Sequence, residues 1–74
     1  MYTADVDVNG QRVRELRQEH VLTLRELADE SGVSKDTINR IERGHGAYPT
    51  TIRKLARALG VEPRELVKRG SNHA

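Results

Sequence analysis

One short stretch of the chain, residues 34–43, gathers the side chains whose types and spacing could do chemistry. In a helix, counted at 100° per residue, five polar residues of this stretch fall within one arc of about 140°. Ile38 and Ile41 fall on the opposite side. A rigid face of cations, a carboxylate and an amide can address base edges and phosphates of a duplex. The five residues are Lys35, Asp36, Asn39, Arg40 and Arg43.

The elements that must position this face are predicted to be helices. Apolar residues recur at three- and four-residue spacing along most of the chain, which is the helical period. The pattern predicts an all-α fold with five helices at about 10–20, 24–31, 35–43, 49–59 and 63–68. The start signals are Asn9, a capping box of Thr23 and Glu26, Ser34, and the prolines Pro49 and Pro63.

The chain is predicted to form one domain over residues 9–70, with residues 1–8 as an N-terminal arm and 71–74 as a tail. In the arm, Val6 and Val8 alternate with Asp5 and Asp7, which is the period of a strand. Two interpretations of the arm stay open. It is a flexible terminus, or it is an edge strand that pairs with a second copy of the chain.

Composition limits the classes of function. A chain of 74 residues has room for one modest core and little room for a water-excluding active site. The chain has no cysteine, which excludes disulfides and thiolate metal sites and agrees with a cytoplasmic location. No apolar run is long enough for a membrane span. His20, His45 and His73 lack metal-ligand spacing, and we expect no enzyme activity, no cofactor and no metal.

The second and third predicted helices have the layout of a helix-turn-helix, because two helices of about eight residues are joined by a tight turn that contains Gly32. Over about residues 10–66 the sequence resembles the Xre/Cro/phage-repressor helix-turn-helix family. The motifs that carry the resemblance are RVREL-R at 12–17, LTLRELA at 22–28, GVS at 32–34, INRIERG at 38–44 and TIRKLARALGV at 51–61.

The resemblance implies a compact five-helix, lambda-repressor-like bundle that binds double-stranded DNA as a small transcriptional regulator, with the third helix in the major groove. It assigns base reading to Lys35, Asp36 and Arg40, and we expect Asn39 on the same face to read bases as well. For Asp36 and Arg40 two alternatives stay open, a helix-dipole role for Asp36 and an ion pair between the two. The expected contacts to the DNA backbone are Ser34, Thr37, Arg43, His45, Tyr48 and Arg25.

A structural ion pair is expected between Arg17 and Glu42. Each charge lies at the edge of an apolar helix face, where an unpaired ion is unfavourable. A salt bridge between the first and third helices satisfies both, and the family resemblance implies the same pair.

Some residues depart from the family pattern. Leu24 stands where a polar residue usually grips a phosphate, and Ser31 stands where an apolar residue is usual. The loop 45–48 has no Lys or Arg. These departures keep a second hypothesis open, in which the same fold is a protein-interaction module of the antitoxin or coactivator type.

A homodimer on a palindromic site is expected, because one short helix contacts only about four or five base pairs. The dimer surface is predicted to come from the fifth helix, through Val61, Leu66 and Val67, or from the segment 2–8.

Overall fold

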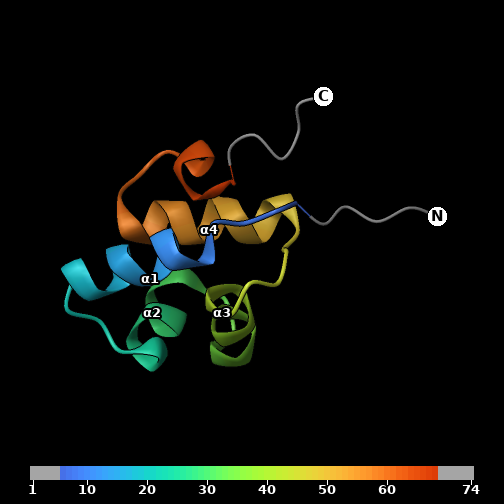
Figure 1. Ribbon diagram of the computed structural model, residues 1–74. Helices are drawn as coiled ribbons and strands as arrows, with labels where there is room; N and C mark the ends of the chain where they lie inside the picture. Colours follow the sequence, from blue (N-terminus) through green and yellow to red (C-terminus); the bar gives the residue numbers. More distant parts are fainter. Residues whose placement is uncertain (1–5, 69–74) are drawn as a thin grey trace.

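The computed structural model describes residues 6–68, and the parts of the predicted arm and tail at 1–5 and 69–74 lie outside the described residues. Along this part of the chain, four α-helices and one 3-10 helix follow one another (Figure 1). Within residues 6–68, no helix combines the length and the apolar character needed to cross a membrane. The elements are α1 (Gly10–Glu19), α2 (Leu24–Ser31), α3 (Lys35–Glu42), α4 (Pro49–Leu59) and the 3-10 helix η1 (Pro63–Leu66).

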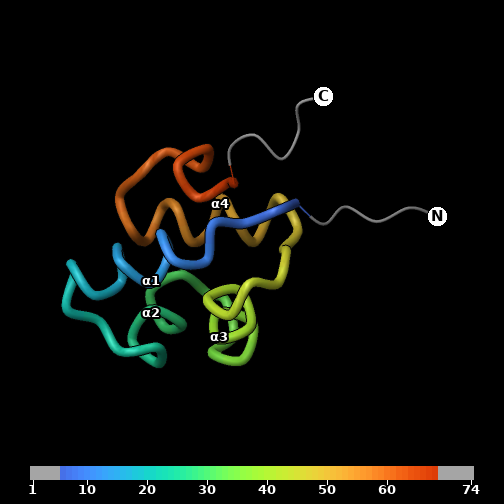
Figure 2. Tube along the Cα trace, viewed as in Figure 1, coloured from blue at the N-terminus to red at the C-terminus, as the bar shows by residue number. Residues whose placement is uncertain are grey.

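The helices pack around one apolar core. α2 contacts both α3 and α4, α1 contacts α3 and η1, and η1 also lies against α4. The chain path places α2 and α3 together at one end of the molecule and α4 with η1 at the other (Figure 2). The largest core side chains with less than 2% exposure are Val13, Leu27, Ile38, Ile41, Leu55, Leu59 and Leu66.

Local capping explains where the helices begin. The Asn9 side chain accepts a hydrogen bond from the Arg12 backbone N–H at 3.1 Å. Thr23 and Glu26 form the expected capping box, with N···O distances of 3.0 and 2.9 Å. Because these signals lie within a few residues of each helix start, they act without help from the tertiary fold.

The fifth predicted helix is wrong in kind and in length. The chain forms a single 3-10 turn, Pro63–Leu66, rather than an α-helix to residue 68. Leu66 has 0% exposure in the core, and Val61 and Val67 are half-buried against it. The sequence analysis predicted that Leu66 belongs to a dimer surface. This prediction is wrong, because the side chain is buried in the core.

The described part of the arm pairs with its own chain, so the prediction that it pairs with a second copy does not hold for Val6 and Val8. Val6 forms an antiparallel bridge with Ala47, and Val8 forms one with Val67. Val8 is 5% exposed. The alternation at Val6 and Val8 agrees with this pairing, but the partner residues lie in the α3–α4 loop and directly after η1.

The start of α1 lies directly against the end of α3. A Cβ added to Gly10 would overlap the carbonyl oxygen of Ile41 and lie 3.1 Å from the Cα of Glu42. Both are backbone atoms of a packed helix, so a larger residue at this position would push the two helices apart.

Gly10→Ala is expected to lower the free energy of unfolding by about 1–3 kcal/mol, because the added methyl group overpacks this contact. Denaturant unfolding monitored by circular dichroism measures the change. Gln11→Ala, at the exposed neighbouring position, serves as the control and should be nearly neutral. A Gly10→Ala protein as stable as the wild type would contradict the close approach.

α1 ends on a strained residue. Val21 has φ of 56°, a left-handed conformation that is unfavourable for a β-branched side chain. Its N–H donates to the Gln18 carbonyl at 2.9 Å, and the Leu22 N–H donates to the Arg17 carbonyl at 3.0 Å. This pair of bonds is the usual helix ending on a left-handed residue, here with valine where glycine is favoured.

Val21→Gly is expected to raise the free energy of unfolding by about 0.5–1 kcal/mol, because glycine relieves the strain and only part of the gain is lost to the freer unfolded chain. The valine is 85% exposed, so little packing is lost. Thermal unfolding is the measurement, with Gln18→Gly inside α1 as a control that should destabilise by about 1 kcal/mol. If both glycines destabilise equally, Val21 is not strained.

Candidate nucleic-acid interface

α3 is amphipathic in the way its sequence indicates. Ile38 and Ile41 are 0% and 1% exposed, and they fix one side of the helix in the core. Lys35, Asp36 and Arg40 are exposed, and Asn39 is half-buried. Lys35, Asp36 and Arg40 are therefore available to an outside partner, with Asn39 at the margin.

The start of α3 holds two hydroxyl groups in a defined arrangement. The Ser34 Oγ accepts from the Thr37 N–H at 3.1 Å and donates to the Thr37 Oγ1 at 2.8 Å. A hydroxyl carries one hydrogen, so the Ser34 hydrogen is used within the cap. The hydroxyl hydrogen of Thr37 stays available to a ligand, which favours Thr37 over Ser34 as a phosphate donor.

The turn between α2 and α3 accounts for one departure from the family pattern, the serine at position 31. Gly32 has φ of 78°, the left-handed conformation expected of a tight turn. The Ser31 Oγ accepts from the Val33 N–H at 3.1 Å, so this serine satisfies the turn instead of packing in the core.

Leu24, at the start of α2, packs against the core, so its side chain cannot replace the usual phosphate anchor. The Glu26 carboxylate also lies at the start of α2. Its negative charge repels a DNA phosphate that approaches this helix end.

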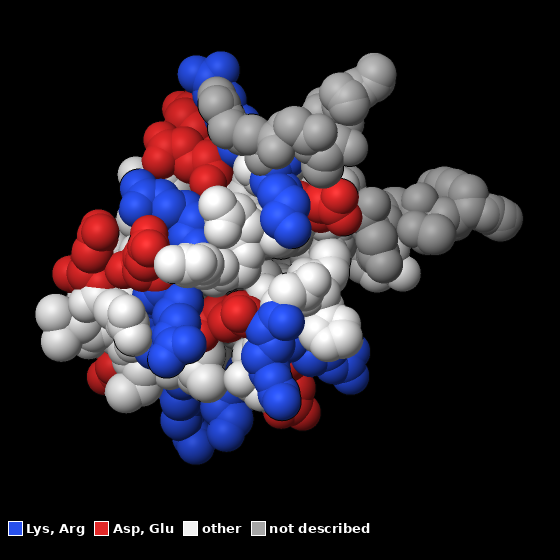
Figure 3. Space-filling model, viewed as in Figure 1, with Lys and Arg blue, Asp and Glu red and all other residues white. Residues whose placement is uncertain are grey.

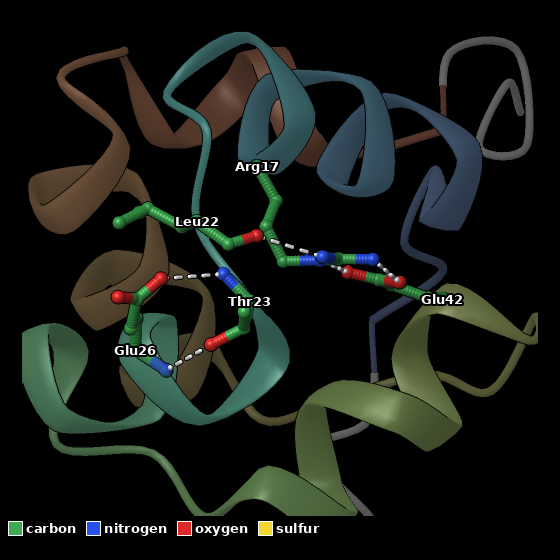
Figure 4. A network of polar contacts seen from close by, with 5 residues as sticks. All are labelled: Arg17, Leu22, Thr23, Glu26 and Glu42. Carbon is green, nitrogen blue, oxygen red and sulfur yellow. Dashed lines mark hydrogen bonds and ion pairs between the residues drawn. The ribbon is translucent and has the colours of Figure 1, made fainter.

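The ion pair between Arg17 and Glu42 joins α1 to the end of α3 (Figure 4). The Arg17 Nε donates to Glu42 Oε2 at 2.7 Å, and Nη2 donates to Oε1 at 3.1 Å. The third nitrogen, Nη1, donates to the Leu22 carbonyl at 2.8 Å. One guanidinium group therefore connects α1, the segment before α2, and α3.

This pair is largely withdrawn from water, since the side chains of Arg17 and Glu42 are 14% and 7% exposed. The hydrogen bond to Glu42 raises the pKa of Arg17 above its ordinary value, although burial acts in the opposite direction. Fork-like pairing of this kind also fixes the relative orientation of the two side chains. The end of α3 is therefore held at a defined position relative to α1.

A hollow of about 390 Å³ lies between α3, the following loop and the start of α4. Tyr48 gives α4 no side-chain cap, so the positive end of that helix is open to an anion. The sequence analysis did not predict Thr51 as part of this surface. Its position in the first turn of α4, just after Pro49, was the signal that could have indicated it. The lining residues are Thr37, Arg40, His45, Gly46, Ala47, Tyr48 and Thr51.

The remaining expected contact residues lie on the surface. Arg43, the C-cap of α3, is exposed, as are Arg25 on α2 and His45 and Tyr48 in the loop. In residues 6–68, the ion pairs do not include Asp36 or Arg40, so the alternative pairing of these two residues is wrong. Figure 3 shows Lys and Arg side chains over the end of the molecule formed by α2 and α3, with acidic side chains among them.

Comparison with known proteins now identifies this architecture. The HTH_3 helix-turn-helix family model matches residues 13–66. The chain belongs to this family. The expected all-α fold with a helix-turn-helix at α2 and α3 is thus confirmed, with four α-helices and a 3-10 turn in place of five α-helices.

Among helix-turn-helix relatives, the transcriptional repressor RghR of Bacillus subtilis is 48% identical over 54 residues, which are 70% of this chain and 40% of that protein. The chain thus spans less than half the length of this curated relative. The restriction-modification controller protein C.AhdI from Aeromonas hydrophila has a TM-score of 0.72 and 44% identity, covering 76% of this chain and 86% of that one.

Two further solved structures show the same fold. The biofilm regulator SinR, solved in complex with DNA, has a TM-score of 0.70 and 32% identity, covering 74% of this chain and 90% of that one. A hydroxyethylphosphonate dioxygenase has a TM-score of 0.76 at 22% identity. Because this chain matches only 15% of that enzyme, the likeness shows the fold alone.

Arg17→Ala is expected to lower the free energy of unfolding by about 3–5 kcal/mol, because Glu42 would stay buried without a counter-ion and the Leu22 carbonyl would lose its donor. Arg14→Ala, on the same helix and exposed, is the matched control and should change stability by less than about 0.5 kcal/mol. The measurement is chemical denaturation.

Arg17→Met combined with Glu42→Leu should recover most of the lost stability, because it removes both charges together. If Arg17→Ala proves no worse than Arg14→Ala, the pair does not hold α3 in place.

Proposed function

We propose that this chain binds double-stranded DNA in a sequence-specific way and acts as a small transcriptional regulator, with α3 in the major groove. The observation that carries the proposal is the fixed orientation of α3, whose apolar face is buried while Lys35, Asp36 and Arg40 face solvent. Membership of the helix-turn-helix family and the similarity to RghR, a transcriptional repressor, support it. A cytoplasmic location and the absence of enzyme activity are part of this proposal.

Base recognition is assigned to the exposed face of α3. Arg40 and Lys35 suit the O6 and N7 acceptors of guanine, and Arg40 can make both bonds at once. Asp36 suits the N4 donor of cytosine. Asn39 is half-buried and would contact an adenine edge only at close approach of the helix.

Phosphate contacts are assigned to the rim of the hollow beside α3. Thr37, His45 and Tyr48 lie there with Arg40, and the uncapped start of α4 adds backbone N–H groups that suit an anion. Further phosphate contacts are assigned to two exposed arginines, Arg43 at the end of α3 and Arg25 at the start of α2. Such contacts supply most of the affinity and little of the sequence choice.

A homodimer on a palindromic site completes the proposal, since two copies of α3 spaced about 34 Å apart would contact two half-sites on one face of the duplex. Leu66 lies in the core and the Val6 backbone is paired within the chain, so neither supplies the surface that joins the two copies.

A second candidate is a protein-interaction module of the antitoxin or coactivator type. The loop 45–48 contains no Lys or Arg, so its cationic contribution to phosphate binding is weak. Under this alternative, duplex binding is absent or independent of sequence, and the partner is a protein.

The test is selection of duplexes from a random library, followed by affinity measurements for Arg40→Ala and Lys35→Ala. Each variant should fold normally, bind the selected duplex about 10- to 100-fold more weakly, and lose preference at one base pair, because a good base contact is worth about 1–3 kcal/mol. Arg57→Ala removes an equal charge from the exposed face of α4 and should change the affinity less than threefold.

Wild-type binding should also fall with salt with a log–log slope of about −0.9 per phosphate contacted. If the wild type selects no duplex even at low salt, DNA recognition is excluded and the protein-interaction alternative stands.

A further inference from the structure

Residues 6–9 pair with two other segments of the chain, one along each edge of their backbone, through two isolated antiparallel bridges. Val6 exchanges two hydrogen bonds with Ala47, at 2.7 Å from the Val6 N–H and 3.1 Å from the Ala47 N–H. On the opposite edge, the Asp7 carbonyl accepts from Lys68 at 3.0 Å, and the Asn9 N–H donates to Leu66 at 2.7 Å. Alternation of edges along the backbone is the geometry of an extended strand paired on both sides.

The Val6 bonds supply the backbone support of the α3–α4 loop. The His45 N–H donates to the Arg40 carbonyl at 3.0 Å, which completes the end of α3. The Tyr48 carbonyl accepts from the Ile52 N–H at 3.1 Å, which begins α4. Between these two points, within residues 6–68, the backbone hydrogen bonds of the loop are those of Ala47 with Val6.

Ala47 lies between the two loop residues assigned to phosphate binding. Its side chain is buried at 6% exposure, while Tyr48 is 57% exposed and His45 is also exposed. Both flanking residues line the hollow that contains Arg40. A displacement of Ala47 would therefore move the side chains of His45 and Tyr48 relative to α3.

We propose that Val6 is a positioning residue for DNA binding: its backbone bonds to Ala47 hold the loop so that His45 and Tyr48 meet the phosphates of a duplex. This inference rests on the DNA-binding function proposed above and adds to it a residue outside the helix-turn-helix. Val6 itself makes no contact with the duplex under this proposal.

The effect should be confined to phosphate contacts, because α3 is fixed by other means. Ile38 and Ile41 hold its apolar side in the core, and the Arg17–Glu42 pair holds its end. Loss of the Val6 bonds leaves all of these in place. A loosened loop should therefore weaken binding to every duplex by a similar factor and leave base preference unchanged.

The decisive variant is Val6→Pro, since proline lacks the N–H that donates to the Ala47 carbonyl. Val6→Ala keeps the N–H and is the matched control for loss of the side chain. Affinity for the selected duplex and for its single-base-pair variants is measured from about 50 to 200 mM salt. The folded, active fraction of each protein is determined by stoichiometric titration. Each affinity is calculated from the active concentration, so a loss of stability does not count as a loss of affinity.

Val6→Pro should bind all duplexes about three- to tenfold more weakly, with a salt slope smaller by about 1, and with unchanged ratios between the duplexes. Val6→Ala should keep the wild-type slope. The Ala47 amide should exchange its hydrogen faster in Val6→Pro than in Val6→Ala. Should Val6→Pro fail to fold, Val6→Gly, which keeps the N–H but loosens the extended backbone, should change affinity and slope in the same direction by a smaller amount.

A wild-type salt slope in Val6→Pro, or in Val6→Gly where that variant replaces it, overturns the positioning role while leaving the DNA-binding function intact. Lost base preference overturns it as well, since the bonds would then support α3. If the wild-type protein binds no duplex, the proposed function fails first and the positioning role fails with it.

Discussion

The paired charges of Arg17 and Glu42 are the constraint on which the rest of the molecule depends. With side chains 14% and 7% exposed, neither charge could be held there without the other. The same guanidinium also binds the Leu22 carbonyl, just before the capping box that starts α2. A single, largely buried guanidinium therefore connects α1, α2 and α3. At eight residues, α3 is too short to be stable in water without such packing.

Because α3 is anchored through one face, its opposite, charged face is free to contact a partner. Ile38 and Ile41 occupy the core, and Gly10 allows α1 to approach the α3 backbone at Ile41. The charged face then needs no internal partner, and in residues 6–68 neither Asp36 nor Arg40 takes part in an ion pair. Because the helix backbone is already fixed, only the side chains themselves have to be ordered when they bind, which suits specific recognition.

Sequence reasoning succeeded where the deciding residues are close together. The bounds of α2 and α4 follow from Thr23, Glu26 and Pro49 at their starts, and the exposed face of α3 follows from the helical period. It failed where the partner lies far along the chain. The pairing of Val6 with Ala47 and the burial of Leu66 depend on the assembled fold. The left-handed Val21 carries no local signal, because valine disfavours that conformation.

Chemical protection of guanine N7 on a selected duplex tests the central claim most directly, because N7 is exposed only in the major groove. The account predicts that the wild-type protein shields guanine N7 within the bound site. It also predicts that Arg40→Ala, at a concentration that saturates the same duplex, leaves one of those guanines reactive. Tight binding with every N7 still reactive would contradict the placement of α3 in the major groove.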